Sequence, residues 1–221
     1  MAIKPILFNT EMVRAILDGR KTCTRRLVKP QPKSKLCYTF AGSDSDTWGY
    51  PNRTAHEIWG EEFKLPNDIT EEELSKRWNP PYHTDDILYV RETWCGLPVN
   101  EAGHMRGHTI YYYKADGELR PKGWRGTWHP SIHMPKEAAR IWLKVTDVRV
   151  ERLQEITSEQ ICREGVEVEY PHVLNGEEKR YAFSTLWNNT IKKSDIDRYG
   201  WDANPWVWVI KFERCEKPER V

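Results

Sequence analysis

Residues 16–26, Ile-Leu-Asp-Gly-Arg-Lys-Thr-Cys-Thr-Arg-Arg, constrain the fold of this chain more than any other stretch. An apolar, helix-compatible run ends at Gly19, and glycine accepts the left-handed backbone that commonly ends a helix. The segment Thr22–Leu27 follows almost at once and is rich in residues that favour strands. We therefore predict a helix that turns directly into a short strand.

The strand period of two divides this segment into two faces. Thr24 and Arg26 lie on one face, while Cys23 and Arg25 lie on the other. Lys21 lies at the bend before the strand. An ammonium, a hydroxyl and a guanidinium can then face one pocket, and that grouping suits an anionic or nucleotide-like ligand.

The hydrophobic pattern of the whole chain predicts an α+β fold. Strands are expected at Ile6–Asn9, Thr22–Leu27, Asp86–Thr93, Thr109–Lys114, Ala139–Leu153 and Pro205–Glu213, and helices at Glu11–Asp18, Glu71–Arg77, Thr157–Glu164 and Tyr181–Ile191. Thr10 is the expected N-cap of the first helix, and Thr157 with Gln160 forms an expected capping box. Residues 31–84 and 95–107 lack such periodicity and are interpreted as irregular. Short strands with long loops between them favour a mixed β-barrel flanked by helices.

Composition excludes several classes of protein. The 34 basic and 33 acidic residues nearly cancel, but residues 19–35 contain seven Lys or Arg and no acid, which indicates a phosphate-facing patch. The five cysteines are scattered and odd in number, as in a reduced cytoplasmic protein. No apolar run approaches the roughly 20 residues that span a membrane. We expect a cytoplasmic protein without a membrane partner, whose oligomeric state the sequence leaves open.

The opening segment resembles the signature of the ASCH family, small β-barrel domains related to the PUA RNA-binding fold. That signature is Gly-x-Lys-x-x-Glu-x-Arg after a short helix, and Gly19, Lys21 and Arg26 fill three of its four fixed positions. Thr24 replaces the common glutamate. The branch with amidohydrolase activity on 4-acetylcytidine also carries threonine there, in a similar Gly-Arg-Lys-Thr-x-Thr-x-Arg run.

The resemblance covers roughly residues 3–30, 84–94, 138–168 and 180–213. It implies one ASCH or PUA-like domain over residues 1–221, a mixed β-barrel with flanking helices. Two long insertions are implied at about 31–83 and 95–137. Trp128–Pro135 and Asn204–Trp208 resemble a larger phage and prophage branch of ASCH-like proteins.

The resemblance to the amidohydrolase branch implies catalytic roles for Lys21, Thr24 and Glu164. Amide hydrolysis needs a nucleophile, a base and an acid for the departing nitrogen. Thr24 is then the nucleophile and Lys21 its base, with positive neighbours that favour a neutral amine. The expected partner is a modified nucleoside or RNA. Two alternatives stay open: a non-catalytic RNA-binding module, and an ASCH-type ribonuclease.

Further residues are candidates for binding the substrate. Arg26, with Arg25 beside it, offers planar paired donors to a phosphate or a base carbonyl. Glu92 is a further candidate, and the alternative role of Arg26 is a structural ion pair, with Glu92 as its partner. Aromatic rings near strand ends can stack on a base, and these are Trp94, Trp128 and Trp206.

Metal and nucleotide-cofactor chemistry have little support. The pairs His104/His108 and His129/His133 have a spacing that helices use for zinc, but both lie in segments containing Gly or Pro, where that spacing loses its meaning. Neither a P-loop nor a Gly-x-Gly-x-x-Gly motif is present. We expect neither a metal nor a cofactor.

Overall fold

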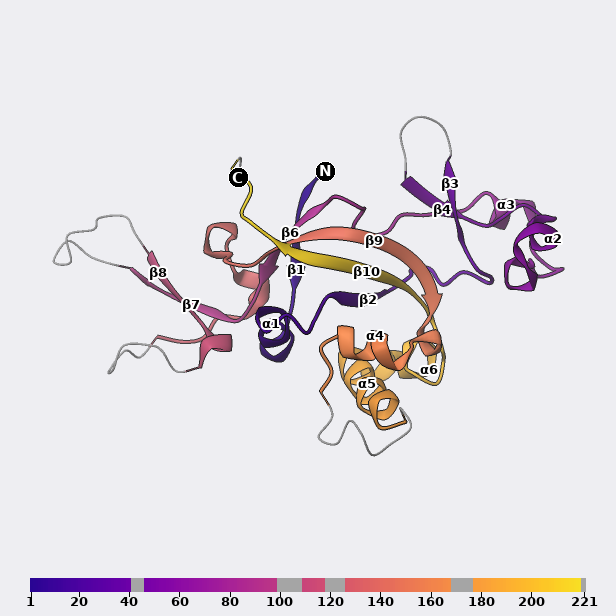
Figure 1. Cartoon of the computed structure of the whole chain (residues 1–221). Coiled ribbons are helices and arrows are strands. Elements are labelled where there is room, and N and C mark those ends of the chain that lie inside the picture. Colours follow the sequence, from indigo (N-terminus) through magenta and orange to yellow (C-terminus); the bar gives the residue numbers. More distant parts are fainter. Residues whose placement is uncertain (41–45, 99–108, 118–125, 168–176, 220–221) are drawn as a thin grey trace.

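A five-stranded mixed sheet occupies the centre of the molecule (Figure 1). The computed structural model describes residues 1–40, 46–98, 109–117, 126–167 and 177–219. The strand order is β1-β6-β9-β10-β2, with bounds β1 Ile3–Leu7, β2 Cys23–Leu27, β6 Ile87–Arg91, β9 Trp142–Arg152 and β10 Trp206–Cys215. Only the β1–β6 pair within this sheet is parallel. The strand that follows Gly19 is therefore confirmed, and it lies at an edge of the sheet.

The α+β class is confirmed, but the described residues form an open sheet and not the closed barrel that we expected. A barrel would require the two edge strands, β1 and β2, to pair with each other. They lie at opposite edges with three strands between them. The long strands β9 and β10 curve along the sheet instead (Figure 1). β10 is buried on both faces from Trp206 to Ile210, because helices cover one side and the main apolar core lies on the other.

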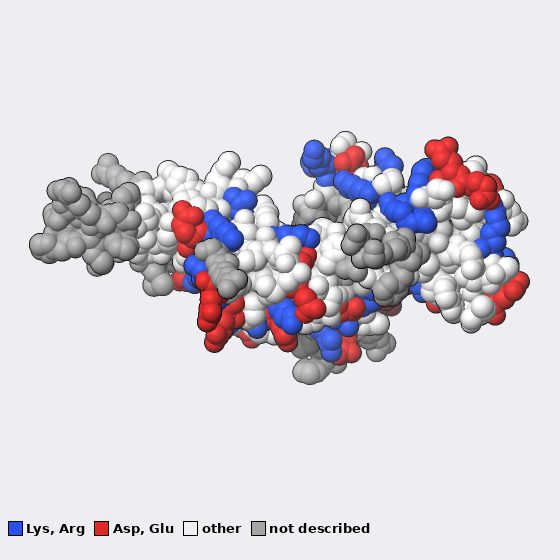
Figure 2. All heavy atoms as spheres, turned by 90° about the horizontal axis from the view of Figure 1, so that it is seen from above, with Lys and Arg blue, Asp and Glu red and all other residues white. Residues whose placement is uncertain are grey.

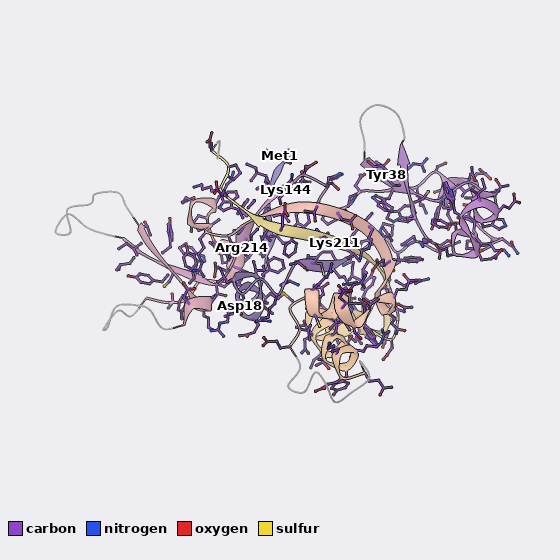
Figure 3. All side chains as sticks on the ribbon, in the orientation of Figure 1. Met1, Asp18, Tyr38, Lys144, Lys211 and Arg214 are labelled. Atoms are coloured by element: carbon purple, nitrogen blue, oxygen red, sulfur yellow. The ribbon has the colours of Figure 1, made fainter. Side chains whose placement is uncertain are left out.

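Helix α1, Thr10–Leu17, connects the two edge strands. Its N-cap is Asn9 and not Thr10, since the Asn9 amide oxygen accepts a hydrogen bond of 2.8 Å from the Met12 amide. Thr10 is the first helical residue. The helix ends as predicted, because Gly19 adopts a φ of +76° in the left-handed region. Asp18, the C-cap of α1, is labelled below the sheet in Figure 3.

Three further helices lie on one side of the sheet (Figure 1), namely α4 Ser158–Arg163, α5 Glu177–Thr190 and α6 Ile196–Tyr199. The predicted capping box of α4 is confirmed: the Gln160 amide donates to the Thr157 hydroxyl at 3.2 Å, and the Thr157 amide donates to the Gln160 side chain at 3.0 Å. Helix α5 starts four residues earlier than predicted. These helices and the sheet share an apolar cluster of Leu153, Ile156, Ile161, Phe183, Trp187, Val207 and Val209.

Residues 31–83 contain more regular structure than the sequence predicts. The helix expected at Glu71–Arg77 is present as α3, Glu71–Leu74, while β3 Cys37–Phe40, β4 Asp46–Gly49, α2 Ala55–Trp59 and β5 Arg77–Trp78 lie in the stretch interpreted as irregular. Strand β3, which carries Tyr38, belongs to a lobe beside the central sheet (Figure 3). The lobe contacts the sheet through Trp48, whose ring centroid lies 5.7 Å from that of Trp208. Trp78 is buried and its indole donates to the Pro30 carbonyl at 2.7 Å, whereas Trp59 is more than half exposed.

The other predicted insertion also contains a strand that we missed. β7, Trp94–Pro98, pairs antiparallel with β8, Thr109–Tyr113, although residues 95–107 were expected to be a loop. The segment becomes a strand because its backbone pairs with the tyrosine-rich β8. The sequence of β7 by itself does not indicate this pairing. That both insertions belong to one domain stays a prediction.

The remaining short elements are 3-10 turns at Glu61–Phe63, Lys114–Asp116, Ser131–His133, Lys136–Ala138, Leu153–Glu155 and Lys193–Asp195. Within the part of the chain that is described, every helix is too short or too polar to cross a membrane.

Candidate functional site

Lys21 and Glu164 form a buried ion pair where the ends of α1 and α4 meet. The Lys21 side chain is fully buried, and its ammonium donates to three oxygens, each at 2.8 Å: the carboxylate Oε2 of Glu164, the carbonyl of Glu164 and the carbonyl of Cys23. The two residues also form an antiparallel backbone bridge. The three N–H groups of the ammonium are thus all engaged.

Gly165 makes this close approach feasible. Its φ is +83°, and a Cβ at this position would lie 2.7 Å from the Ala15 Cβ and 3.1 Å from the Lys21 Cβ. The Lys21 amide in turn donates to the Ala15 carbonyl at 2.9 Å. The glycine after Glu164 therefore allows α4 to end directly against α1, and this contact places Glu164 beside Lys21.

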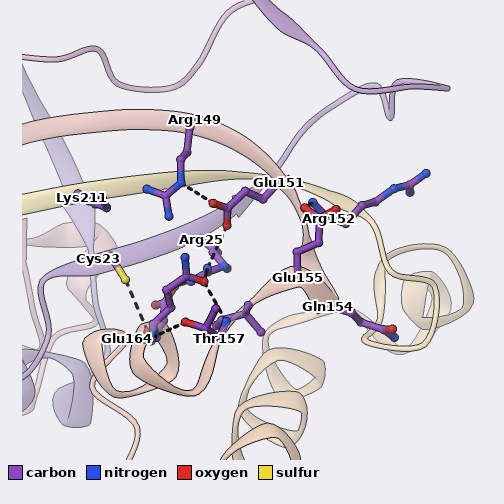
Figure 4. A network of polar contacts seen from close by, with 12 residues as sticks. Cys23, Arg25, Arg149, Glu151, Arg152, Gln154, Glu155, Thr157, Glu164 and Lys211 are labelled. Carbon is purple, nitrogen blue, oxygen red and sulfur yellow. Dashed lines mark hydrogen bonds and ion pairs between the residues drawn. The ribbon is translucent and has the colours of Figure 1, made fainter. Parts of the chain in front are cut away.

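Arg25 holds the second oxygen of the same carboxylate. Its Nη1 donates to Glu164 Oε1 at 3.0 Å, and its Nη2 donates to Gln160 at 2.9 Å and lies 3.4 Å from Glu151 (Figure 4). The Gln160 oxygen is the one that also caps α4, so the cap and the ion pair are joined. Arg25 Nε is buried and has no hydrogen-bond partner among the described residues.

A pocket of about 550 Å³ opens beyond the edge strand β2, between α1 and α5. It is lined by Met12, Thr24, Arg25, Arg26, Leu27, Lys29, Asn79, Pro81, Tyr82, Glu164, Phe183, Leu186, Trp187, Thr190, Ile191 and Trp208. Thr24 and Glu164, two of the three predicted catalytic residues, therefore line the same pocket. The third, Lys21, is not among its lining residues and contacts it through Glu164.

Arg26 and Thr24 form one wall of the pocket. Arg26 Nη1 donates to the Thr24 hydroxyl at 3.1 Å and to the Arg25 carbonyl at 3.1 Å. Burial lowers the pKa of the Arg26 guanidinium, against the opposing influence of Tyr82 and Glu164. Among the described residues, no carboxylate lies within 4 Å of Arg26, so the expected alternative of an ion pair with Glu92 is not formed.

The backbone of β2 also faces the pocket side. The Phe212 amide donates to the Thr22 carbonyl at 2.9 Å, and the Val28 amide donates to the Trp206 carbonyl at 3.1 Å. Since hydrogen-bonded pairs recur every second residue in an antiparallel ladder, the N–H and C=O groups of Arg25 and Leu27 point away from β10, toward the open edge.

The three tryptophans predicted to bind a base do not line the pocket. Trp94 lies beside β8, with its ring centroid 5.8 Å from that of Tyr111, and the Trp206 ring lies under the Arg152 guanidinium at 4.3 Å. Trp128 is likewise absent from the lining.

Four other aromatic residues occupy the pocket wall instead, namely Tyr82, Phe183, Trp187 and Trp208. Sequence reasoning favoured rings in loops and so missed Trp208, which lies in mid-strand. Trp208 lies opposite Arg26 in the β10–β2 ladder. The sequence alone does not reveal this pairing, so no sequence signal could have identified Trp208 as a pocket residue.

Glu92 is also not brought to the pocket. It is almost fully buried in a two-pronged pair with Arg140, with distances of 2.9 and 3.0 Å, and Arg140 lies 2.6 Å from Asp116. Burial raises the pKa of the Glu92 carboxyl, against the opposing influence of Arg140. The geometry of Glu92 is that of a structural anchor.

The Cys23 thiol is buried and unreactive, and no metal cluster is found in the described ranges. Burial, together with the nearby Glu164 carboxylate, raises the pKa of the Cys23 thiol to about 12. No group of three or more His, Cys, Asp or Glu side chains in these ranges is placed to hold a metal ion. His104 and His108 lie outside the described residues.

Comparisons with known proteins give one structural relative. No family model and no curated protein matches the chain. The chain is similar to the crystal structure of an ASCH domain from Lactobacillus crispatus JV V101, with 9% identity and a TM-score of 0.36, over 96% of this chain and 79% of that one. At such identity and TM-score, the likeness carries no conclusion about activity.

Proposed function

We propose that the pocket binds a nucleoside, free or within RNA, and that the chain is an amidohydrolase that removes an acyl group from a modified cytidine. One observation carries the proposal: the Thr24 hydroxyl and the Glu164 carboxylate line the same pocket, and Lys21 contacts that carboxylate at 2.8 Å. These are the residues to which the resemblance assigns the chemistry.

The pocket suits a planar, acceptor-rich ligand of this size. Its volume of about 550 Å³ lies within the usual range of ligand pockets, about 300–1,000 Å³. The partly exposed Tyr82 ring can stack on a base, whereas Trp208 is buried against Trp48 and closes the wall behind it. The Arg26 guanidinium offers donors to base carbonyls or phosphate.

The proposed reaction is a transfer of the acyl group to Thr24, followed by hydrolysis. Lys21 first passes a proton to Glu164 and then accepts the Thr24 hydroxyl proton as the oxygen bonds to the acyl carbon. The C–N bond breaks, and the exocyclic nitrogen takes a proton from Glu164, which lines the pocket. Water then releases the acid from Thr24 and returns a proton to the threonine oxygen. Arg26 stabilises the developing oxyanion.

A non-catalytic binding module is the second candidate, and a specific observation favours it. All three N–H groups of Lys21 and both oxygens of Glu164 are engaged within the protein. A pair saturated in this way can simply hold the end of β2 in place. In that case Arg26 binds the ligand, and Thr24 only lines the pocket.

The first experiment compares Thr24→Val with Thr24→Ser, measuring release of the acyl group from 4-acetylcytidine. Valine has a similar shape without the hydroxyl, so we expect turnover to fall by about 10³-fold, whereas serine retains measurable activity. Affinity for the nucleoside and the thermal midpoint, measured on the same samples, control for folding. Equal turnover by Thr24→Val and the parent would exclude threonine as the nucleophile.

The second experiment separates the enzyme from the binder by Lys21→Arg. Arginine keeps the charge but does not act as a base in proteins, so an enzyme loses turnover. A binding module largely keeps its affinity for RNA. Absence of turnover in the parent across acylated cytidines, together with measurable binding, would favour the module.

A further inference from the structure

The wall of the pocket is rich in donors and positive charge. Glu164 is the carboxylate among the described lining residues, and both of its oxygens are already held by Lys21 and Arg25. The remaining charged lining groups, Arg26 and Lys29, are cations. A ligand that fits this wall must therefore supply acceptors and negative charge.

Lys29 differs from the next lysines along the chain. It lines the pocket with an exposed side chain, and its ammonium lies 5.0 Å from the centre of the Tyr199 ring. Within the described ranges no carboxylate lies within 4 Å of it. By contrast, Lys33 lies 2.8 Å from Glu73, and Lys35 makes a similar surface pair. Lys29 thus keeps an uncompensated charge at the pocket mouth.

Arg26 and Lys29 lie three residues apart along the same edge of the sheet, and both line the pocket. The β2–β10 ladder continues to Val28, so the backbone between the two cations is extended. Three residues of extended chain span about 10 Å. Their side chains leave the strand on opposite faces, and the pocket extends around this edge of the sheet to both of them. A base and its own phosphate bound in this pocket can therefore contact the two cations.

We propose that the preferred ligand is a nucleotide whose phosphate binds Lys29, and not an uncharged nucleoside. This inference rests on the proposed function, because the base is assumed to occupy the pocket. The chemistry recognised is a ribose phosphate. It occurs as a monoester in a free nucleotide and as a diester in RNA, and the ligands of the test distinguish these two sources.

Calorimetry on the full chain tests the proposal with cytidine, cytidine 5′-monophosphate, cytidine 3′-monophosphate and a cytidine dinucleotide. We expect at least one phosphorylated ligand to bind about tenfold more tightly than cytidine at low salt. Lys29→Ala removes this advantage and leaves the affinity for cytidine unchanged. The matched control is Lys33→Ala, a nearby exposed lysine outside the pocket lining, and it keeps the advantage.

The results separate the two proposals. Equal affinity of the parent for cytidine and for all three phosphorylated ligands would overturn the Lys29 phosphate site. It would still support a pocket that binds the nucleoside. Binding of inorganic phosphate as tightly as a nucleotide would support the Lys29 site but remove the support for a base pocket. No binding of any of these ligands would overturn both. A preference for the dinucleotide identifies RNA, and a preference for a monophosphate identifies a free nucleotide.

Discussion

At the scale of single residues, the buried ion pair of Lys21 and Glu164 should contribute strongly to stability. Removing one partner of such a pair leaves a charge in a poorly solvated place, which costs about 3–5 kcal/mol in typical proteins. Arg25 still contacts Glu164 when Lys21 is replaced, so we expect Lys21→Met to lower the free energy of unfolding by about 3 kcal/mol. Urea denaturation measures this. A loss below the error of the measurement would contradict the pairing, and Lys33→Met is the surface control.

Cys23 lies beside the same pair and gives a prediction that depends on pH. Its thiol pKa is raised from 9.0 to about 12, so the folded state keeps the proton where the unfolded state loses it. The resulting stabilisation is fully present below pH 9 and is lost as the pH rises toward 12. At pH 8 we expect iodoacetamide to modify the exposed Cys162 rapidly and Cys23 only after unfolding, as peptide mass analysis will show. Rapid labelling of Cys23 in the native chain would contradict its burial.

At the scale of elements, two glycines end helices but differ in what surrounds them. Gly19 and Gly165 both have positive φ, yet a Cβ at Gly19 meets open space while one at Gly165 meets Ala15 at 2.7 Å. Alanine at either site pays the left-handed penalty of about 1–2 kcal/mol. We expect Gly165→Ala to cost at least about 1 kcal/mol more than Gly19→Ala, because overpacking adds to the strain. Thermal and urea unfolding compare the two variants, and equal costs would show that α4 is not seated against α1.

At the scale of the whole molecule, aromatic contacts and not charge join the lobe of β3, β4 and β5 to the central sheet. Basic and acidic side chains are interspersed on the face seen in Figure 2. The lobe of β3, β4 and β5 instead joins the main apolar core, which includes Leu36, Tyr50, Trp78 and Trp208. We infer that this lobe and the central sheet unfold together.

Trp78→Ala tests that inference. Truncating a buried tryptophan costs about 3–5 kcal/mol, and the loss should lower the midpoint of a single transition for the whole chain. Circular dichroism and tryptophan fluorescence should report the same midpoint, with the exposed Trp59→Ala as the control. Two separate transitions would show that the lobe is an independent unit.

The sequence by itself determined the local elements around the site. The stop at Gly19, the strand at Cys23–Leu27 and the Thr157–Gln160 capping box depend on backbone conformation and on neighbours within a few residues, so they were predictable. The helix N-cap was misplaced by one residue, because Asn9 and Thr10 are both good caps and only the chain path selects between them.

Only the tertiary structure decided which side chains share the pocket. Trp208 lines the pocket because it pairs with Arg26, 182 residues before it (208 − 26) in the sequence, and Glu92 is held away from the pocket by its pairing with Arg140. The sheet is open because β1 and β2 lie at its opposite edges, and the local periodicity of the sequence does not predict this strand order. Long-range pairing depends on the sum of many packing contacts, and no short motif contains that sum.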